Sequence, residues 1–96
     1  MDNNTIKKVS SIIRKRIKEM PENSYTTKIL RKGKVKIANK VGEEAVETIS
    51  AFLYQNNSEI LEESADLIFH LLILLESCNL TFNDVEKILE KRIKSD

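Results

Sequence analysis

The sequence of 96 residues contains one cysteine, one proline, two glycines and no tryptophan. The single cysteine, Cys78, excludes an internal disulfide and suits a reducing compartment, and we expect it to pack as a small buried apolar residue. The scarcity of helix-breaking residues favours long helices over many short strands. The N-terminus, MDNNTIKKVSS, lacks the apolar core of a signal peptide, and the longest apolar run, LIFHLLILL (67–75), is too short to span a bilayer. We therefore expect a cytoplasmic protein that does not enter a membrane.

The length fits a single domain over residues 1–96 with a modest core. Apolar residues recur at three- and four-residue steps, which predicts amphipathic helices and no strand. The expected helices span residues 6–20, 25–32, 34–54, 59–77 and 82–94. Their short connections favour an all-α antiparallel bundle of about five helices. Because so small a core leaves apolar surface uncovered, we also expect the bundle to be completed by oligomerisation.

Polar residues between these segments predict where the helices begin and end. Ser24, Ser58 and Thr81 are the expected N-caps, because a hydroxyl oxygen can accept a hydrogen bond from a free amide of the first turn. Asp84 follows Thr81 at the spacing of a capping box. Asn79 is expected to end the preceding helix in a left-handed conformation.

The net charge is only +1, but the charges are distributed unevenly along the chain. Residues 28–40 contain six basic side chains and no acid, whereas residues 41–86 contain ten acids and no lysine or arginine. One interpretation is a dipolar, solvated surface. The other is a cation site beside an anion site, the arrangement that a metal-bound polyphosphate requires. The basic residues of the first helix do not indicate nucleic-acid binding, because aromatic residues are few and no base-reading motif is present.

The segment KVGEEAVE (40–47) places Glu43, Glu44 and Glu47 on one side of an expected helix. Like charges at these spacings repel, so either water solvates them or a cation holds them together. The three acids border the apolar face of that helix, which is formed by Val41, Ala45, Ile49, Phe52 and Leu53. Taken alone, the pattern is also typical of a solvated helix face.

The expected helix over 59–77 is apolar on nearly every side except where Glu63, Asp66 and His70 lie. A helix of this kind is usually central, so we expect Glu63 and Asp66 to be at least partly buried. Buried carboxylates need a partner, either a basic side chain of the first or last helix or a divalent metal. A lone histidine in such a helix is more often a hydrogen-bonded core residue than a ligand.

Two acidic pairs, Glu44-x-x-Glu47 and Glu63-x-x-Asp66, each place two carboxylates on one face of a helix. Antiparallel packing of the two helices would bring the pairs together. Carboxylate oxygens without thiolates suit a hard cation such as Mg²⁺ or Mn²⁺. Because Mg²⁺ usually retains water and shares its shell with substrate phosphates, the pairs indicate an open site rather than a closed structural one.

Three segments carry a resemblance to a known family, namely SYTTKIL (24–30), KVGEEAVETISA (40–51) and EESADLIFHLLILL (62–75). Their acidic motifs resemble those of the all-α, MazG-like nucleoside triphosphate pyrophosphohydrolases. The finer resemblance is to the phosphoribosyl-ATP pyrophosphohydrolase family, and it covers most of the chain in the same order and spacing. Phe69 stands where a tyrosine is expected, which removes at most one hydroxyl contact. The chain has no room for the cyclohydrolase domain to which many bacterial members are fused, so it resembles the stand-alone form.

This resemblance implies hydrolysis of phosphoribosyl-ATP at its α–β phosphoanhydride, which is the second step of histidine biosynthesis. The products would be phosphoribosyl-AMP and pyrophosphate. The resemblance also implies that Mg²⁺, or alternatively Mn²⁺, is bound by four acids, Glu44, Glu47, Glu63 and Asp66. The catalytic base would be Glu43 or Glu47.

The resemblance further implies a substrate-binding surface and a homodimer or higher homo-oligomer. The implied substrate-binding residues are Lys40, Lys36, Ser24, Tyr25, Thr26 and His70, with Lys28 and Arg31 as weaker candidates. Two of these have an alternative role, because Lys40 can pair with the neighbouring acids and Tyr25 can serve in packing.

Two other functions are compatible with the residues. One is a house-cleaning pyrophosphatase of the same superfamily that acts on dNTPs. The SYT and KVGEEA segments favour phosphoribosyl-ATP over dNTPs, because the shared acidic motif does not require them. The other is a non-catalytic helical module whose acids bind basic partners, which leaves Glu63 and Asp66 unexplained on so apolar a helix.

Overall fold

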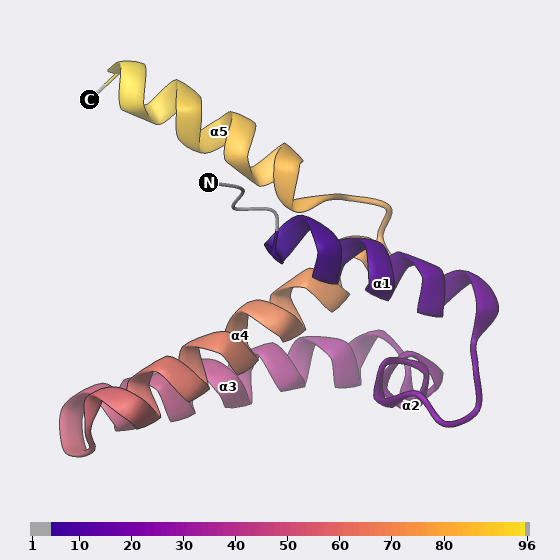
Figure 1. Cartoon of the computed structure of the whole chain (residues 1–96), viewed down its shortest axis with the longest axis horizontal. Coiled ribbons are helices and arrows are strands. Elements are labelled where there is room, and N and C mark those ends of the chain that lie inside the picture. The colour runs from indigo at the N-terminus through magenta and orange to yellow at the C-terminus, as the bar shows by residue number, and fades with distance from the viewer. Residues whose placement is uncertain (1–4, 96) are drawn as a thin grey trace.

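The computed structural model describes residues 5–95, and in this part of the chain all the regular structure is helical (Figure 1). The helices of residues 5–95 are α1 (Thr5–Glu19), α2 (Tyr25–Lys32), α3 (Lys34–Tyr54), α4 (Asn57–Ser77) and α5 (Phe82–Ser95). The predicted all-α class is confirmed. Oligomerisation stays a prediction.

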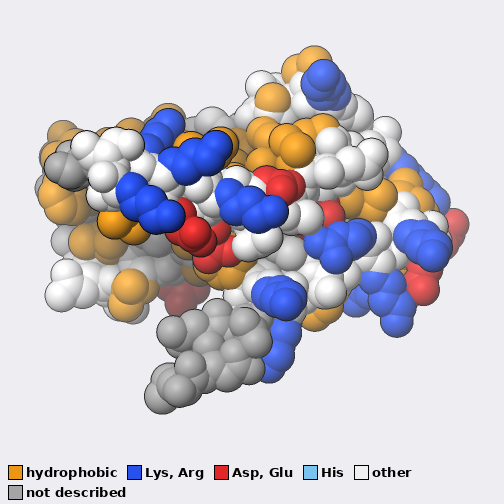
Figure 2. Space-filling view, turned by 90° about the horizontal axis from the view of Figure 1, so that it is seen from above, with side chains coloured by type: hydrophobic (Ala, Val, Ile, Leu, Met, Phe, Trp, Pro, Cys, Tyr) orange, Lys and Arg blue, Asp and Glu red, His pale blue; other side chains and the backbone are white. Residues whose placement is uncertain are grey.

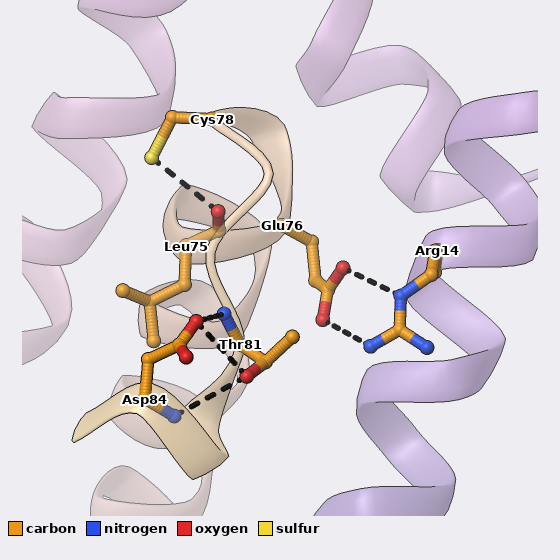
Figure 3. Close-up of polar contacts among 6 residues, drawn as sticks. All are labelled: Arg14, Leu75, Glu76, Cys78, Thr81 and Asp84. Carbon is orange, nitrogen blue, oxygen red and sulfur yellow. Dashed lines mark hydrogen bonds and ion pairs between the residues drawn. The ribbon is translucent and has the colours of Figure 1, made fainter. Parts of the chain in front are cut away.

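Two of the predicted helix caps are present. The Ser24 hydroxyl accepts a hydrogen bond from the Thr27 amide at 3.2 Å and caps α2. At the start of α5, the Thr81 amide donates to Asp84 Oδ2 at 2.9 Å, and the Asp84 amide donates to Thr81 Oγ1 at 3.2 Å (Figure 3). Asn79 has the expected left-handed conformation, with φ 62°.

The predicted cap of α4 was wrong. The side chain of Asn56, rather than Ser58, accepts a hydrogen bond from the Glu59 amide at 3.0 Å, and α4 begins at Asn57. Asparagine and serine cap helices about equally well, so their relative preference could not decide between two candidates two residues apart.

The core lies where α1, α2, α3 and α4 meet. It is formed by the buried side chains of Ile13, Ile29, Ile37, Leu72 and Ile73. Antiparallel packing joins α3 to α4, and α1 crosses over the C-terminal half of α4 (Figure 1). This arrangement places the acidic segments of α3 and α4 side by side.

The buried side of α3 differs from the one that its apolar pattern indicated. Ile37, Glu44 and Ala51 are buried and face the rest of the chain. By contrast, Phe52 is 73% exposed and Leu53 is 57% exposed. Because the Ala51 side chain is small, α3 can approach α4 closely on this side. The helix contact is therefore formed by a row of residues that includes the acid Glu44. One apolar face of α3 is left without cover in the single chain.

Cys78 is also exposed, contrary to its expected burial. The cause is its position directly after the last residue of α4, where the chain turns away from the core. Its thiol contacts the Leu75 carbonyl oxygen at 3.3 Å (Figure 3).

The last helix, α5, stands apart from the rest of the described chain. It contacts α1 and contributes no buried residue (Figure 1). In Figure 2, which views the molecule from this side, lysine and arginine side chains are interspersed with acids and apolar groups, a mixture typical of a solvated surface. No single helix within residues 5–95 is long and apolar enough to cross a membrane, and α4 and α5 reach that length only as a pair bent by 106°.

A bidentate ion pair connects α1 to the end of α4. Arg14 Nε and Nη2 donate to the two carboxylate oxygens of Glu76 at 2.9 and 2.7 Å (Figure 3). The Glu76 side chain is only 4% exposed, whereas Arg14 is 54% exposed. Because a buried carboxylate needs a donor, this pair fixes the position of α1 on α4.

We expect Arg14→Ala to lower the free energy of unfolding by about 1–3 kcal/mol, because it leaves the buried Glu76 carboxylate unpaired. Urea denaturation followed by circular dichroism measures this change. Lys15→Ala, at an exposed position of the same helix, is the matched control. Equal losses in the two variants would show that the ion pair adds nothing to stability.

Candidate functional site

Three acids from α3 and α4 converge at the contact between these helices. One carboxylate oxygen each from Glu44, Glu63 and Asp66 can be chosen so that all three lie within 4.8 Å of one another. Glu44 is buried and Glu63 is half-buried, but Asp66 is exposed, so its expected burial was wrong. Asp66 lies at the border of the contact between α3 and α4 rather than within it, so its side chain reaches solvent. The acidic cluster, defined as Glu44, Glu63 and Asp66, therefore opens to solvent on the Asp66 side.

Glu44 is the acid that most needs a partner. It is 7% exposed, and its Oε2 atom has no hydrogen-bond partner. The adjacent Glu47 carboxylate and burial raise the pKa of Glu44 to about 7, although Lys40 opposes the shift. A divalent cation would satisfy the unpaired oxygen and offset the repulsion among the acids, so the residues fit such an ion.

Glu63 shares this environment. Its partial burial, together with the nearby carboxylates of Glu47 and Asp66, raises its pKa above the ordinary value. Both helices therefore bring carboxyl groups into positions where the charged form is disfavoured. Clustering of this kind, with oxygen donors alone, suits a hard cation such as Mg²⁺ or Mn²⁺.

The other two acids of α3 lie at the edge of the cluster. Glu47 is exposed and lies outside the three-residue group, but it is close enough to raise the pKa values of Glu44 and Glu63. Glu43 is exposed and lies 3.8 Å from Lys40 Nζ, measured from its Oε1 atom. Both carboxylates are therefore open to a ligand that approaches from solvent.

Lys40 lies between the acids and the start of α2. Its Nζ atom is 4.0 Å from Glu44 Oε1, and only 20% of its side chain is exposed. Burial lowers the pKa of Lys40, but Tyr25 and the two adjacent acids of α3 raise it by more, so it stays above the ordinary value. The ammonium group is therefore held in its charged form at the rim of the cluster.

Tyr25 and His70 form a hydrogen-bonded pair next to Lys40. The distance from Tyr25 Oη to His70 Nε2 is 2.8 Å, and His70 Nδ1 lies 2.8 Å from the Asp66 carbonyl oxygen. Phe69 packs against the edges of this pair, with its ring centroid 5.4 Å from that of His70. His70 is thus buried and hydrogen-bonded, and it connects α2 to the backbone of a cluster residue.

The remaining predicted substrate-binding residues lie on α2 and the first turns of α3. Ser24 caps α2, and Thr26 is buried. Lys36 is half-buried on α3, whereas Lys28 and Arg31 are exposed. The structure therefore brings Tyr25, His70 and Lys40 to the acidic cluster. The other candidates lie elsewhere on α2 and α3, and Ser24 serves as the N-cap of α2.

Thr48 belongs to the site and was not predicted. Its hydroxyl contacts the carbonyl oxygens of Glu44 at 2.7 Å and Glu63 at 3.1 Å, so it joins the backbones of two cluster residues across the helix contact. The contact within α3 follows from the four-residue spacing, because threonine often donates to the carbonyl one turn earlier. The contact to α4 depends on the packing and has no signal in the sequence.

Comparison with known proteins assigns this geometry to a family. The family model of phosphoribosyl-ATP pyrophosphohydrolase matches residues 6–93. A phosphoribosyl-ATP pyrophosphatase of Sulfolobus acidocaldarius is 47% identical over 94 residues, which cover 98% of this chain and 99% of that protein. One of Metallosphaera sedula is 44% identical and covers 93% of this chain and 96% of its own length. The histidine biosynthesis bifunctional protein HisIE of Thermotoga maritima is 47% identical over 86% of this chain, which corresponds to 42% of that protein.

The raised pKa of Glu44 predicts a pH dependence of stability in metal-free protein. Between about pH 4.5 and about pH 7, the folded protein holds a proton on Glu44 that the unfolded chain releases. The stability contribution of this carboxyl is therefore fully present below about pH 4.5 and is lost as the pH rises through about 7. We expect Glu44→Gln to flatten this decline, as measured by thermal denaturation with EDTA over a pH series.

Glu62→Gln is the matched control, because Glu62 is an exposed acid of α4 next to Glu63 that does not belong to the acidic cluster. This control should retain the pH dependence of the unaltered protein. A slope that is unchanged in Glu44→Gln would show that another group, such as Glu63, causes it.

Proposed function

Because this chain belongs to the phosphoribosyl-ATP pyrophosphohydrolase family, it is a phosphoanhydride hydrolase, and we propose that its active site is the acidic cluster between α3 and α4. The reaction converts phosphoribosyl-ATP and water to phosphoribosyl-AMP and pyrophosphate, the second step of histidine biosynthesis. The observation that carries the assignment of the site is the convergence of Glu44, Glu63 and Asp66 within 4.8 Å. We place the enzyme in the cytoplasm, where a reduced Cys78 is compatible with its environment.

Mg²⁺ is the cofactor that we propose for this cluster, with Mn²⁺ as the substitute. Glu44, Glu63 and Asp66 would hold the ion, and Glu47 would join them from the edge of the cluster. When bound, the ion supplies neutralisation of phosphate charge and activation of water. The unpaired Oε2 atom of Glu44 supports this role, since a buried carboxylate oxygen without a donor is the ligand that a cation would complete.

The exposed carboxylates of α3 are the candidates for the base. Glu43 and Glu47 are both accessible and flank Glu44, so either can take the proton from the attacking water. Glu43 Oε1 lies 3.8 Å from Lys40 Nζ, whereas Glu47 lies among other acids. Variants at both positions are needed to distinguish a base from a ligand.

The basic side chains near the cluster suit the substrate's phosphates. Lys40 is charged, largely buried and within 4.0 Å of the Glu44 carboxylate, so a phosphate bound at the cluster would lie within its reach. Lys36 lies one turn earlier on α3 and would extend this positive surface. Ser24 and Thr26, at the start of α2, would border the substrate at the end away from the acids.

We expect the protein to release pyrophosphate from phosphoribosyl-ATP only when Mg²⁺ or Mn²⁺ is present. Glu63→Gln should reduce kcat by at least about 100-fold, because it removes a charged ligand from a metal that stabilises the transition state. A coupled pyrophosphate assay, with a panel of dNTPs alongside, measures activity and substrate choice together.

Glu62→Gln is the control for this assay, since it alters the neighbouring, exposed acid and should leave kcat unchanged. Turnover of dNTPs in preference to phosphoribosyl-ATP would refute phosphoribosyl-ATP as the substrate but would leave the cluster as the proposed active site. Equal kcat values for Glu63→Gln and Glu62→Gln would overturn the site.

We also propose that a second copy of this chain covers the exposed apolar face of α3. Val46, Ile49, Phe52 and Leu53 lie at helical spacing and are 57–73% exposed, and Leu61 on α4 is 69% exposed. Contiguous apolar surface of this kind is uncommon on monomeric proteins and usually marks an interface. A homodimer formed through α3 and α4 would complete the helical bundle.

We expect the protein to be a dimer or higher oligomer at micromolar concentration and Phe52→Asp to be a monomer, because a charge at the interface would lose its hydration. Size-exclusion chromatography with light scattering measures both. Tyr54→Asp changes a still more exposed aromatic residue off the apolar stripe and should keep the oligomeric state. A monomeric unaltered protein would overturn this assembly.

A further inference from the structure

The hydrogen bonds of His70 determine which of its nitrogens carries a proton. Nδ1 lies 2.8 Å from the Asp66 carbonyl oxygen, which can only accept a hydrogen bond. Nδ1 must therefore be the protonated, donating nitrogen. In the neutral imidazole, Nε2 then has no proton and can only accept.

This tautomer fixes the role of the Tyr25 hydroxyl. Tyr25 Oη lies 2.8 Å from His70 Nε2, so its single proton is donated to the imidazole. The Tyr25 oxygen keeps its lone pairs but has no second proton to give. It can accept a hydrogen bond from an ammonium, hydroxyl or amino group, but it cannot donate one to a phosphate oxygen.

The two rings are held in a geometry that favours this arrangement. The Tyr25 and His70 rings meet at 85° with centroids 5.6 Å apart, and Phe69 closes the same aromatic group at 88° to His70. Because His70 is 5% exposed, water does not compete for its nitrogens.

We propose that His70 is a positioning residue, whose Nδ1-protonated imidazole holds the Tyr25 hydroxyl as a hydrogen-bond acceptor beside the acidic cluster, so that this hydroxyl cannot donate to the substrate's phosphates. The effect of this assignment on catalysis rests on the proposed function. The assignment removes Tyr25 from the set of residues that donate to the substrate's phosphates.

The tautomer can be measured directly because His70 is the only histidine in the chain. Long-range proton–nitrogen correlation NMR distinguishes a protonated from an unprotonated ring nitrogen. In the neutral imidazole, we expect Nδ1 to be protonated and Nε2 to be unprotonated. In Tyr25→Phe, the Nε2 resonance should move, because its only hydrogen bond is lost, whereas Tyr54→Phe should leave the spectrum unchanged.

Steady-state kinetics then test the positioning role. Tyr25→Phe removes one neutral hydrogen bond and should lower kcat/KM for phosphoribosyl-ATP by roughly 3- to 10-fold. His70→Phe keeps an aromatic ring but no nitrogen, so the double variant should lose no more than the larger single loss. Tyr54→Phe should show full activity.

Two results would overturn the proposal. A proton on Nε2 in the unaltered protein would reverse the direction of the Tyr25 hydrogen bond. Losses that multiply in the double variant would show that the two residues act separately. The NMR measurement requires no turnover, so an inactive protein with the expected tautomer would refute the proposed function alone.

Discussion

A buried carboxyl group at the contact between α3 and α4 is the constraint on which the rest of the site depends. Glu44 occupies a position where an apolar side chain would ordinarily lie, and one of its oxygens has no partner within the described chain. Its neighbours on both helices are acids, so the contact is unfavourable for charge unless a proton or a cation is present. The helix pair is held together around it by the apolar residues of the core and by Ala51.

The fold was largely predictable because its determinants are local. The scarcity of proline and glycine, the helical periodicity and the residues at Ser24, Thr81 and Asp84 each act within a few positions of the chain. The prediction of the N-cap of α4 was wrong because Asn56 and Ser58 are chemically similar candidates. The predicted burial of Cys78 was wrong because its exposure depends on how the chain leaves α4, and no local pattern specifies that direction.

The acids of the site could be named from spacing and family resemblance, but their environments could not. Glu44 was expected beside the apolar face and is buried at the helix contact, whereas Asp66 was expected to be at least partly buried and is exposed. Periodicity shows which residues share a helix side. It does not show which side faces a neighbour when two apolar faces compete, and here Phe52 and Leu53 remain uncovered.

Thr48 connects the two helices that carry the acidic cluster. Its hydroxyl contacts the carbonyl oxygens of Glu44 and Glu63, so the separation of two ligand-bearing backbones is fixed by the length of one short side chain. The separation of the carboxylates across the helix contact is therefore linked to a residue that carries no carboxylate itself.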